Sequence, residues 1–254
     1  MTQAYKGIIF DIDGVLEYHD QVYPGAPEIL DWLRERQVEI RFLSNSTLKS
    51  RASAAEDLRQ KGFNLADEEL ITASYATANY LRTLNPRSCW VMLDGKGLDE
   101  FAEFEQSCED PDYIVIGDYR NHFNYQNMNK ALRLLHRGAN LIGMIPELVD
   151  FSQGDLELNV GSWVQVLERA TGIQATYIGK PFPYGYELTL ASMEVSRERV
   201  VMIGDQVDTD IKGAQAVGLK TILLTTGEYW LHHMNGEIQA DHTFDSIEKI
   251  VQVF

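Results

Sequence analysis

Two aspartates, Asp11 and Asp13, directly follow a short apolar run in the stretch KGIIFDIDGVL. Residues i and i+2 of an extended chain point to the same side, so both carboxylates can face one pocket. Gly14 comes next and lets the backbone turn sharply beside them. Carboxylates crowded into a small volume repel one another and resist ionisation. The pattern therefore indicates a site that binds a hard cation or keeps one acid protonated.

Three further apolar runs end at residues that can do chemistry. These residues are Ser44 and Asn45 after RFL, Lys180 after TYIG, and Asp205, Asp208 and Asp210 at and after the end of VVMIGD. In open α/β sheets ligands bind outside the carboxyl ends of the strands, so we expect these segments to meet. Oxygen ligands favour Mg²⁺, which takes one or two carboxylates and a phosphate oxygen. With a lysine beside the metal, the group expected to bind is a phosphoryl group. A carboxylate can act as the nucleophile that accepts it.

The elements that must position these residues alternate along the chain. Apolar strands such as GIIF and VEIRFLSN are followed by amphipathic helices such as PGAPEILDWLRERQ and SRASAAEDLRQKG. The same alternation returns in VVMIGD, DIKGAQAVG, KTILLTTG and SIEKIVQVF near the end of the sequence. Alternating strands and helices predict an α/β fold, here a doubly wound, Rossmann-like parallel sheet with helices on both faces.

The middle of the sequence carries strands and a helix of its own, in CWVMLDG, DYIVIGD, NLIGMIP and YQNMNKALRLLHRG. This region either continues the same sheet or forms a second α/β domain inserted into the first. Insertion is favoured because the decisive polar residues lie before about residue 50 and after about residue 178. We predict a discontinuous core domain of residues 1–82 and 176–254 and an inserted α/β cap domain of residues 83–175.

Composition narrows the range of partners. The 254 residues carry a formal net charge of −16, and a surface this acidic repels phosphate backbones and anionic lipid. Neither nucleic acid nor membrane is therefore an expected partner. No apolar run reaches the roughly 20 residues of a membrane helix, and MTQAYKGIIFDID lacks the apolar core of a signal peptide. Cys89 and Cys108 form no metal or redox motif, so we expect reduced thiols and a cytoplasmic protein.

Taken together, FDIDGVL, FLSNST, YIGKP and MIGDQVDTDI resemble the four signature motifs of the haloacid dehalogenase-like superfamily. They come in that family's order and near its spacing. A DxDG motif alone is common, whereas all four at strand ends form a specific signal. The GKP and GDQVDTDI forms are similar to the subgroup with a large inserted cap, the NagD-like phosphatases. The whole chain resembles the branch that contains phospholysine phosphohistidine inorganic pyrophosphate phosphatase.

The resemblance implies three catalytic residues. Asp11 is the expected nucleophile and, through the same carboxylate, a Mg²⁺ ligand. Asp13 is the expected general acid and base, and its backbone carbonyl is a further ligand to the metal. Lys180 is expected to offset charge between Asp11 and the phosphoryl group.

The remaining motif positions receive binding roles from the same resemblance. Ser44 is expected to hydrogen-bond the phosphoryl oxygens, helped by the backbone of Asn45. Asp205 is expected to bind Mg²⁺ directly. Asp210 is expected to lie next to the metal ligands without binding the metal itself. The role of Asp208 stays open, with capping of the following helix as the alternative.

The activity that the resemblance implies is Mg²⁺-dependent hydrolysis of small phosphorylated metabolites through an aspartyl phosphate on Asp11. Two alternatives stay open: a phosphotransferase or phosphomutase of the same superfamily, and a non-enzymatic phospho-aspartate signalling module. The second is disfavoured because the chain is about twice the length of such a module. Capped members of this superfamily often dimerise through the cap, so the resemblance also points to a homodimer of that kind.

Overall fold

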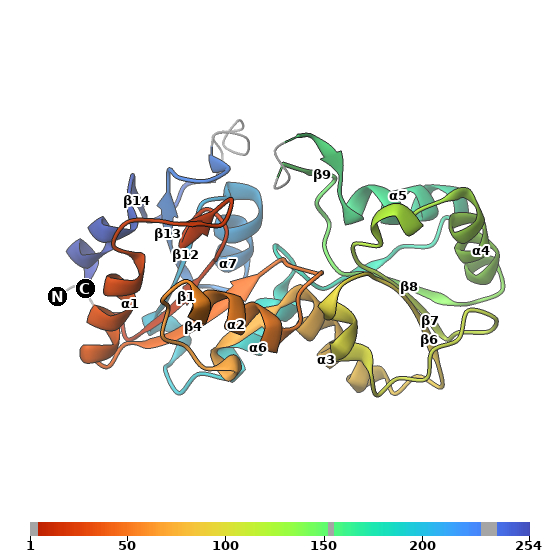
Figure 1. Cartoon of the computed structure of the whole chain (residues 1–254), viewed down its shortest axis with the longest axis horizontal. Helices are drawn as coiled ribbons and strands as arrows, with labels where there is room; N and C mark the ends of the chain where they lie inside the picture. Colours follow the sequence, from red (N-terminus) through yellow and green to blue (C-terminus); the bar gives the residue numbers. More distant parts are fainter. Residues whose placement is uncertain (1–4, 152–154, 230–237) are drawn as a thin grey trace. The chain divides into compact units, whose positions relative to one another are not determined.

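The computed structural model describes residues 5–151, 155–229 and 238–254 (Figure 1). The chain forms two compact units, a first unit of residues 1–44, 54–71 and 180–254 and a second unit of residues 45–53 and 72–179. The predicted cap, residues 83–175, lies within the second unit, and its assignment as a cap domain stays a prediction. Residues 1–4, part of the stretch assessed above for a signal peptide, lie outside the described residues.

The first unit is built on a six-stranded sheet in the order β14-β13-β12-β1-β4-β5. Its strands are β1 (Gly7–Phe10), β4 (Glu39–Ser44), β5 (Leu70–Thr72), β12 (Val200–Gly204), β13 (Lys220–Leu224) and β14 (His242–Phe244). The paired strands from β14 to β4 are parallel, and Phe10 lies opposite both Ile203 and Phe42. β1 is buried along its whole length, which explains why it reads as a continuous apolar run.

Helices cover both faces of this sheet. On one face lie α1 (Ala26–Glu35), α2 (Arg51–Gln60) and the 3₁₀ helix η6 (Ile247–Val253). Their buried side chains pack in one cluster with Ile8 and Phe10 of β1. On the other face α6 (Pro183–Ala191) contacts β4 and α7 (Lys212–Ala216) contacts β13. Helices on both faces of a parallel sheet confirm the predicted doubly wound α/β class.

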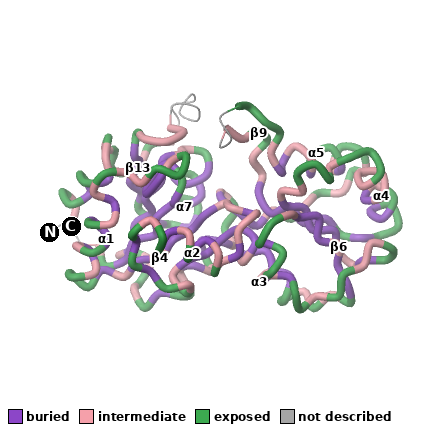
Figure 2. The backbone as a smooth tube through the Cα atoms, in the orientation of Figure 1, coloured by how far each residue is buried: buried purple, intermediate pink, exposed green. Residues whose placement is uncertain are grey.

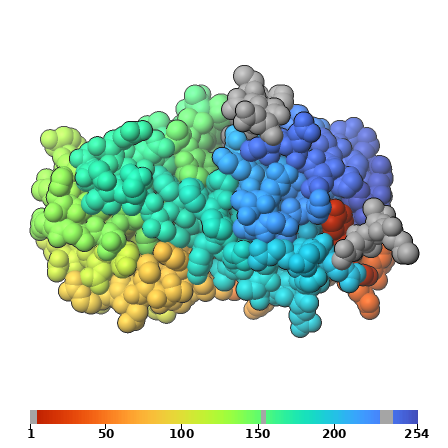
Figure 3. Space-filling model, turned by 180° about the vertical axis from the view of Figure 1, so that it is seen from behind, coloured from red at the N-terminus to blue at the C-terminus, as the bar shows by residue number. Residues whose placement is uncertain are grey.

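The two ends of the sequence combine in this unit. Figure 3 shows residues near the N-terminus, in red, beside residues near the C-terminus, in blue. The pairing of β1 with β12 brings them together, and the buried strand backbones appear in purple in Figure 2. Shorter elements complete the unit: β2 (Glu17–Tyr18) and β3 (Gln21–Val22), which form an antiparallel hairpin, the 3₁₀ helices η1 (Asp67–Glu69) and η4 (Arg197–Arg199), and the π-helical turn η5 (Val207–Ile211).

The second unit has a parallel sheet of its own, in the order β11-β8-β7-β6. Its strands are β6 (Cys89–Met92), β7 (Tyr113–Ile116), β8 (Asn140–Gly143) and β11 (Thr176–Tyr177), with β9 (Val149–Asp150) and β10 (Glu157–Leu158) as a separate antiparallel pair. Its helices are α3 (Ala73–Leu84), α4 (Tyr125–His136), α5 (Val160–Thr171) and the 3₁₀ helices η2 (Lys96–Phe101) and η3 (Arg120–His122). The second unit is therefore an α/β structure with its own sheet. Among the described residues of both units, no helix has the length and apolar character needed to cross a membrane.

Candidate active site

Three acids and one lysine meet at the carboxyl ends of the strands of the first unit. Asp11 follows β1 and Asp205 follows β12, and both are buried together with Lys180 and Asp210. Lys180 Nζ lies 2.7 Å from Asp11 Oδ1 and 2.7 Å from Asp210 Oδ1. One carboxylate oxygen from each of the three aspartates lies within 4.8 Å of the other two. Segments far apart in the sequence thus build one acidic cluster around a single ammonium group.

Burial makes these acids difficult to ionise. Burial, followed by the charge of Asp210, raises the pKa of Asp11 to about 8, although Lys180 opposes the rise. Burial and the charges of Asp11 and Asp210 also raise the pKa of Asp205 well above its usual value. For Lys180, burial favours the neutral form, but the two adjacent carboxylates outweigh burial and raise the lysine pKa. One ammonium group does not neutralise three carboxylates, so the cluster has an excess of negative charge that suits a divalent cation.

Asp205 has a carboxylate oxygen available to such a cation. Its Oδ2 accepts a hydrogen bond of 2.7 Å from the backbone N–H of Glu228. Its Oδ1 is buried and has no hydrogen-bond partner within the described parts of the chain. Leaving a buried acceptor unsatisfied costs about 1–3 kcal/mol, and more when the group is charged. A hard cation that takes oxygen ligands would satisfy this atom, so the residues present fit Mg²⁺.

Asp13 and Ser44 differ in their exposure to solvent. Asp13 is exposed, and its negative charge contributes to the raised pKa of Asp11. An exposed acid can exchange protons with water, as its predicted role requires. Ser44 is buried at the last position of β4.

Asn45 and Asp208 are the two remaining polar residues that follow the strand ends. Asn45 is the first residue of the second unit, where its Nδ2 donates a hydrogen bond to Glu147. Its contact with a phosphoryl group stays a prediction. Asp208 is exposed within η5, and neither η5 nor α7 begins with a side-chain cap. The suggested capping role of Asp208 is therefore wrong.

A turn that the sequence reading did not single out also borders the cluster. It comprises residues 225–229, directly after β13, and contains the Glu228 N–H that binds Asp205. A Cβ atom at Gly227 would lie 2.3 Å from Asp205 Oδ2, and one at Gly14 would lie 2.1 Å from the same atom. Only glycine fits at these two positions of close approach. The strand-end rule that identified the other residues would have found this turn if it had been applied to KTILLTTG.

The substitution Asp205→Asn should affect the stability of the metal-free protein and the binding of Mg²⁺ in opposite ways. For Asp205→Asn we expect the metal-free protein to unfold about 2–4 °C higher, since one negative charge leaves a crowded, buried cluster and each kcal/mol shifts Tm by that amount in a chain of this size. We also expect the increase in Tm caused by Mg²⁺ to disappear. Thermal unfolding in chelator and in Mg²⁺ measures both effects. Asp208→Asn, which changes an exposed acid nearby, is the control, and a Mg²⁺ shift that survives in Asp205→Asn would contradict the assignment.

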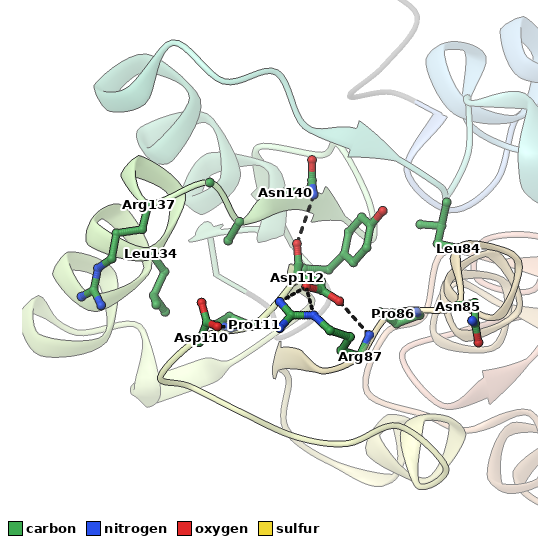
Figure 4. Close-up of a pocket in the computed structure, with 13 residues that line it drawn as sticks. Leu84, Asn85, Pro86, Arg87, Asp110, Pro111, Asp112, Leu134, Arg137 and Asn140 are labelled. Carbon is green, nitrogen blue, oxygen red and sulfur yellow. Dashed lines mark hydrogen bonds and ion pairs between the residues drawn. The ribbon is translucent and has the colours of Figure 1, made fainter.

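The second unit contains a cavity of about 310 Å³ (Figure 4). Tyr113 and Asn140, the first residues of β7 and β8, contribute to its lining. The Arg87 side chain there is bound to Asp112 by a 3.0 Å hydrogen bond from Nε. The cavity lies at the amino ends of the strands and contains none of the predicted site residues. It therefore receives no functional assignment.

Comparisons with known proteins show which class of protein carries this α/β fold and this cluster of acids and lysine. Residues 8–106 match the family model described as haloacid dehalogenase-like hydrolase, and residues 177–250 match a second model described as HAD-hydrolase-like. Human haloacid dehalogenase-like hydrolase domain-containing protein 2 is 36% identical over 227 residues, which cover 89% of this chain and 86% of that protein. Phospholysine phosphohistidine inorganic pyrophosphate phosphatase from Bos taurus is 31% identical over 262 residues, covering 98% of this chain and 93% of that protein.

Solved structures extend the similarity to the whole fold. A p-nitrophenyl phosphatase from Archaeoglobus fulgidus superposes with a TM-score of 0.91 at 26% identity, covering 99% of this chain and 100% of that chain. NagD from E. coli K-12 superposes with a TM-score of 0.86 at 26% identity, covering 96% of this chain and 97% of that chain. The chain belongs to the haloacid dehalogenase-like hydrolase family and to its NagD-like group. The predicted resemblance is confirmed.

Proposed function

We propose that this chain is a Mg²⁺-dependent phosphatase that hydrolyses small phosphate monoesters through an aspartyl phosphate on Asp11. The observation that carries the proposal is the cluster of Asp11, Asp205 and Asp210 around Lys180, with one Asp205 oxygen unsatisfied. The names of several relatives, among them p-nitrophenyl phosphatase, support the reaction class. The expected partner is a small phosphorylated metabolite, and a cytoplasmic location agrees with two free cysteines.

The residues that would hold Mg²⁺ are Asp11 and Asp205, through their carboxylates, and Asp13, through its backbone carbonyl. When bound, the metal supplies positive charge that neutralises the phosphoryl oxygens and keeps the clustered acids ionised. Asp210 anchors the Lys180 ammonium group at 2.7 Å, and the second contact of the same ammonium group, also at 2.7 Å, is Asp11. Lys180 is thereby held where it can offset the charge of both the nucleophile and the phosphoryl group.

The reaction then takes two steps that the chain's own residues carry out. The Asp11 carboxylate attacks phosphorus in line, and the bond from phosphorus to the ester oxygen breaks while Asp13 gives that oxygen a proton. Asp13, now a carboxylate, removes a proton from water, which attacks phosphorus. Phosphate leaves, Asp11 is regenerated, and Asp13 is again protonated.

Turnover in the presence and absence of metal tests this function. We expect the purified protein to release phosphate repeatedly from p-nitrophenyl phosphate in Mg²⁺, and to lose about 100-fold or more of this rate in excess chelator, because the acids then repel the anionic substrate. A panel of phosphorylated metabolites assayed in the same way identifies the substrate. A single phosphate retained per chain would instead indicate a signalling module, and rates that do not depend on metal would contradict the proposal.

A further inference from the structure

The turn at residues 225–229 joins the two strand ends that carry Asp11 and Asp205. The Glu228 N–H donates to Asp205 Oδ2 at 2.7 Å, and Thr226 Oγ1 donates to the carbonyl oxygen of Gly14 at 2.5 Å. The donor of the first bond is a backbone N–H and the donor of the second is a side-chain hydroxyl, and the two donors are only two residues apart in the turn. The orientation of the Asp205 carboxylate therefore depends on where this turn is held.

Tyr23 holds the turn through a further hydrogen bond. Its hydroxyl oxygen accepts a hydrogen bond of 3.0 Å from the Gly227 N–H. The ring is partly buried against the core of the first unit, and the Tyr23 N–H donates to the carbonyl of Leu16 at 2.9 Å. Because both the backbone and the ring of Tyr23 are held in place, its hydroxyl is a rigid support for the turn.

The turn leaves the Asp205 carboxylate little freedom. Oδ2 is bound by the Glu228 N–H, and Gly227 packs so closely that a Cβ atom there would lie 2.3 Å from Oδ2 and 2.4 Å from the Gly14 Cα. Oδ1 is then the atom without a hydrogen-bond partner in the described residues, and thus the one available to a cation. Partners that orient a metal ligand commonly contribute about 10–100-fold to metal affinity.

We propose that Tyr23 is a positioning residue for the metal site, acting through the backbone of Gly227 and Glu228 to present Asp205 Oδ1 to Mg²⁺. This inference rests on the proposed function, since it requires that Asp205 bind the metal. Tyr23 is not a catalytic residue, because it contacts neither the acid cluster nor the site of the reacting atoms directly. It sets how tightly the metal is held.

The test is the Mg²⁺ affinity of Tyr23→Phe, measured by titration calorimetry. We expect Kd to rise about 10-fold, because the ring stays in the core while the Gly227 N–H loses its acceptor. Phosphatase turnover should fall at low Mg²⁺ and recover when Mg²⁺ is raised, which a general loss of folding would not produce. Tyr5→Phe is the matched control, since Tyr5 packs against Phe254 at the amino end of β1 and should retain wild-type affinity.

The outcomes distinguish this inference from the function on which it rests. If wild type binds Mg²⁺, Asp205→Asn does not, and Tyr23→Phe binds as tightly as wild type, the role of Tyr23 is overturned and the metal site stands. If wild type does not bind Mg²⁺, the proposed function and the role of Tyr23 both fall. Thr226→Val removes the hydrogen bond that the Thr226 hydroxyl donates to Gly14, and it should also raise the Kd for Mg²⁺. It provides the readout if Tyr23→Phe does not fold.

Discussion

Asp11→Asn is expected to reduce kcat by about 10⁴-fold or more, the scale seen when an enzyme loses its nucleophile. An amide has the shape of the carboxylate but does not attack phosphorus. The variant should remain folded, because it replaces an acid whose ionisation is opposed by burial, which raises the pKa of Asp11 to about 8, with a neutral amide of the same shape. Phosphate release from p-nitrophenyl phosphate at saturating Mg²⁺ measures the loss.

Two observations make this experiment decisive. Rapid acid quenching of wild type followed by mass spectrometry should recover a phosphoryl group on the peptide that contains Asp11, and the variant should show none. Asp208→Asn serves as the control, since it changes an exposed acid in η5 and should keep wild-type turnover. Undiminished Mg²⁺-dependent activity in Asp11→Asn would remove Asp11 from the role of nucleophile.

Lys180→Met is expected to destabilise the metal-free protein by about 3–5 kcal/mol, the usual result of removing one partner of a buried ion pair. The lysine is buried between Asp11 and Asp210, so its loss leaves both carboxylates without a compensating charge. Urea unfolding in chelator measures the change. Turnover should also fall, because the ammonium group no longer offsets charge at the nucleophile.

A double variant separates this electrostatic effect from the loss of packing. Adding Asp210→Asn to Lys180→Met removes one of the two carboxylates left without a cation and should restore part of the lost stability. The effects of the two substitutions on the free energy of unfolding should therefore not be additive. Lys220→Met is the matched control, because Lys220 pairs with Asp241 at the surface and should contribute little. Equal destabilisation by Lys180→Met and Lys220→Met would show that the buried cluster does not depend on its lysine.

The strand ends could be predicted because burial constrains their sequence. β1 and β12 are buried on both faces, so each reads as an unbroken apolar run that stops where the polar residue begins. Helix α1 was equally predictable, since its buried residues recur on one face. Helices α3, α5 and α6 were not predicted. α3 buries mainly small residues, and in α6 the apolar side chains are not confined to one face, so neither shows a clear helical stripe.

The candidate site was predictable only where side chains carry the chemistry. Asp11, Lys180 and Asp205 were expected to meet, and they do. Asp210 was expected behind the metal ligands, and one of its carboxylate oxygens lies within 4.8 Å of oxygens of Asp11 and Asp205, so its exact role stays a prediction. The turn after β13 contributes a backbone N–H, and Tyr23 acts from a distant part of the sequence. The strand-end rule applied to KTILLTTG could have located the turn, whereas a support that acts from a distant part of the sequence leaves no motif in a single sequence.

A crystal structure with Mg²⁺ and beryllium trifluoride, a mimic of the phosphoryl group, tests the central claim most directly. We expect beryllium bonded to the Asp11 carboxylate, Lys180 Nζ in contact with the fluorides, and Mg²⁺ about 2.0–2.1 Å from oxygens of Asp11 and Asp205. Beryllium fluoride bonded to a different residue, or Mg²⁺ bound away from these two aspartates, would contradict the claim that this acidic cluster is the phosphatase centre.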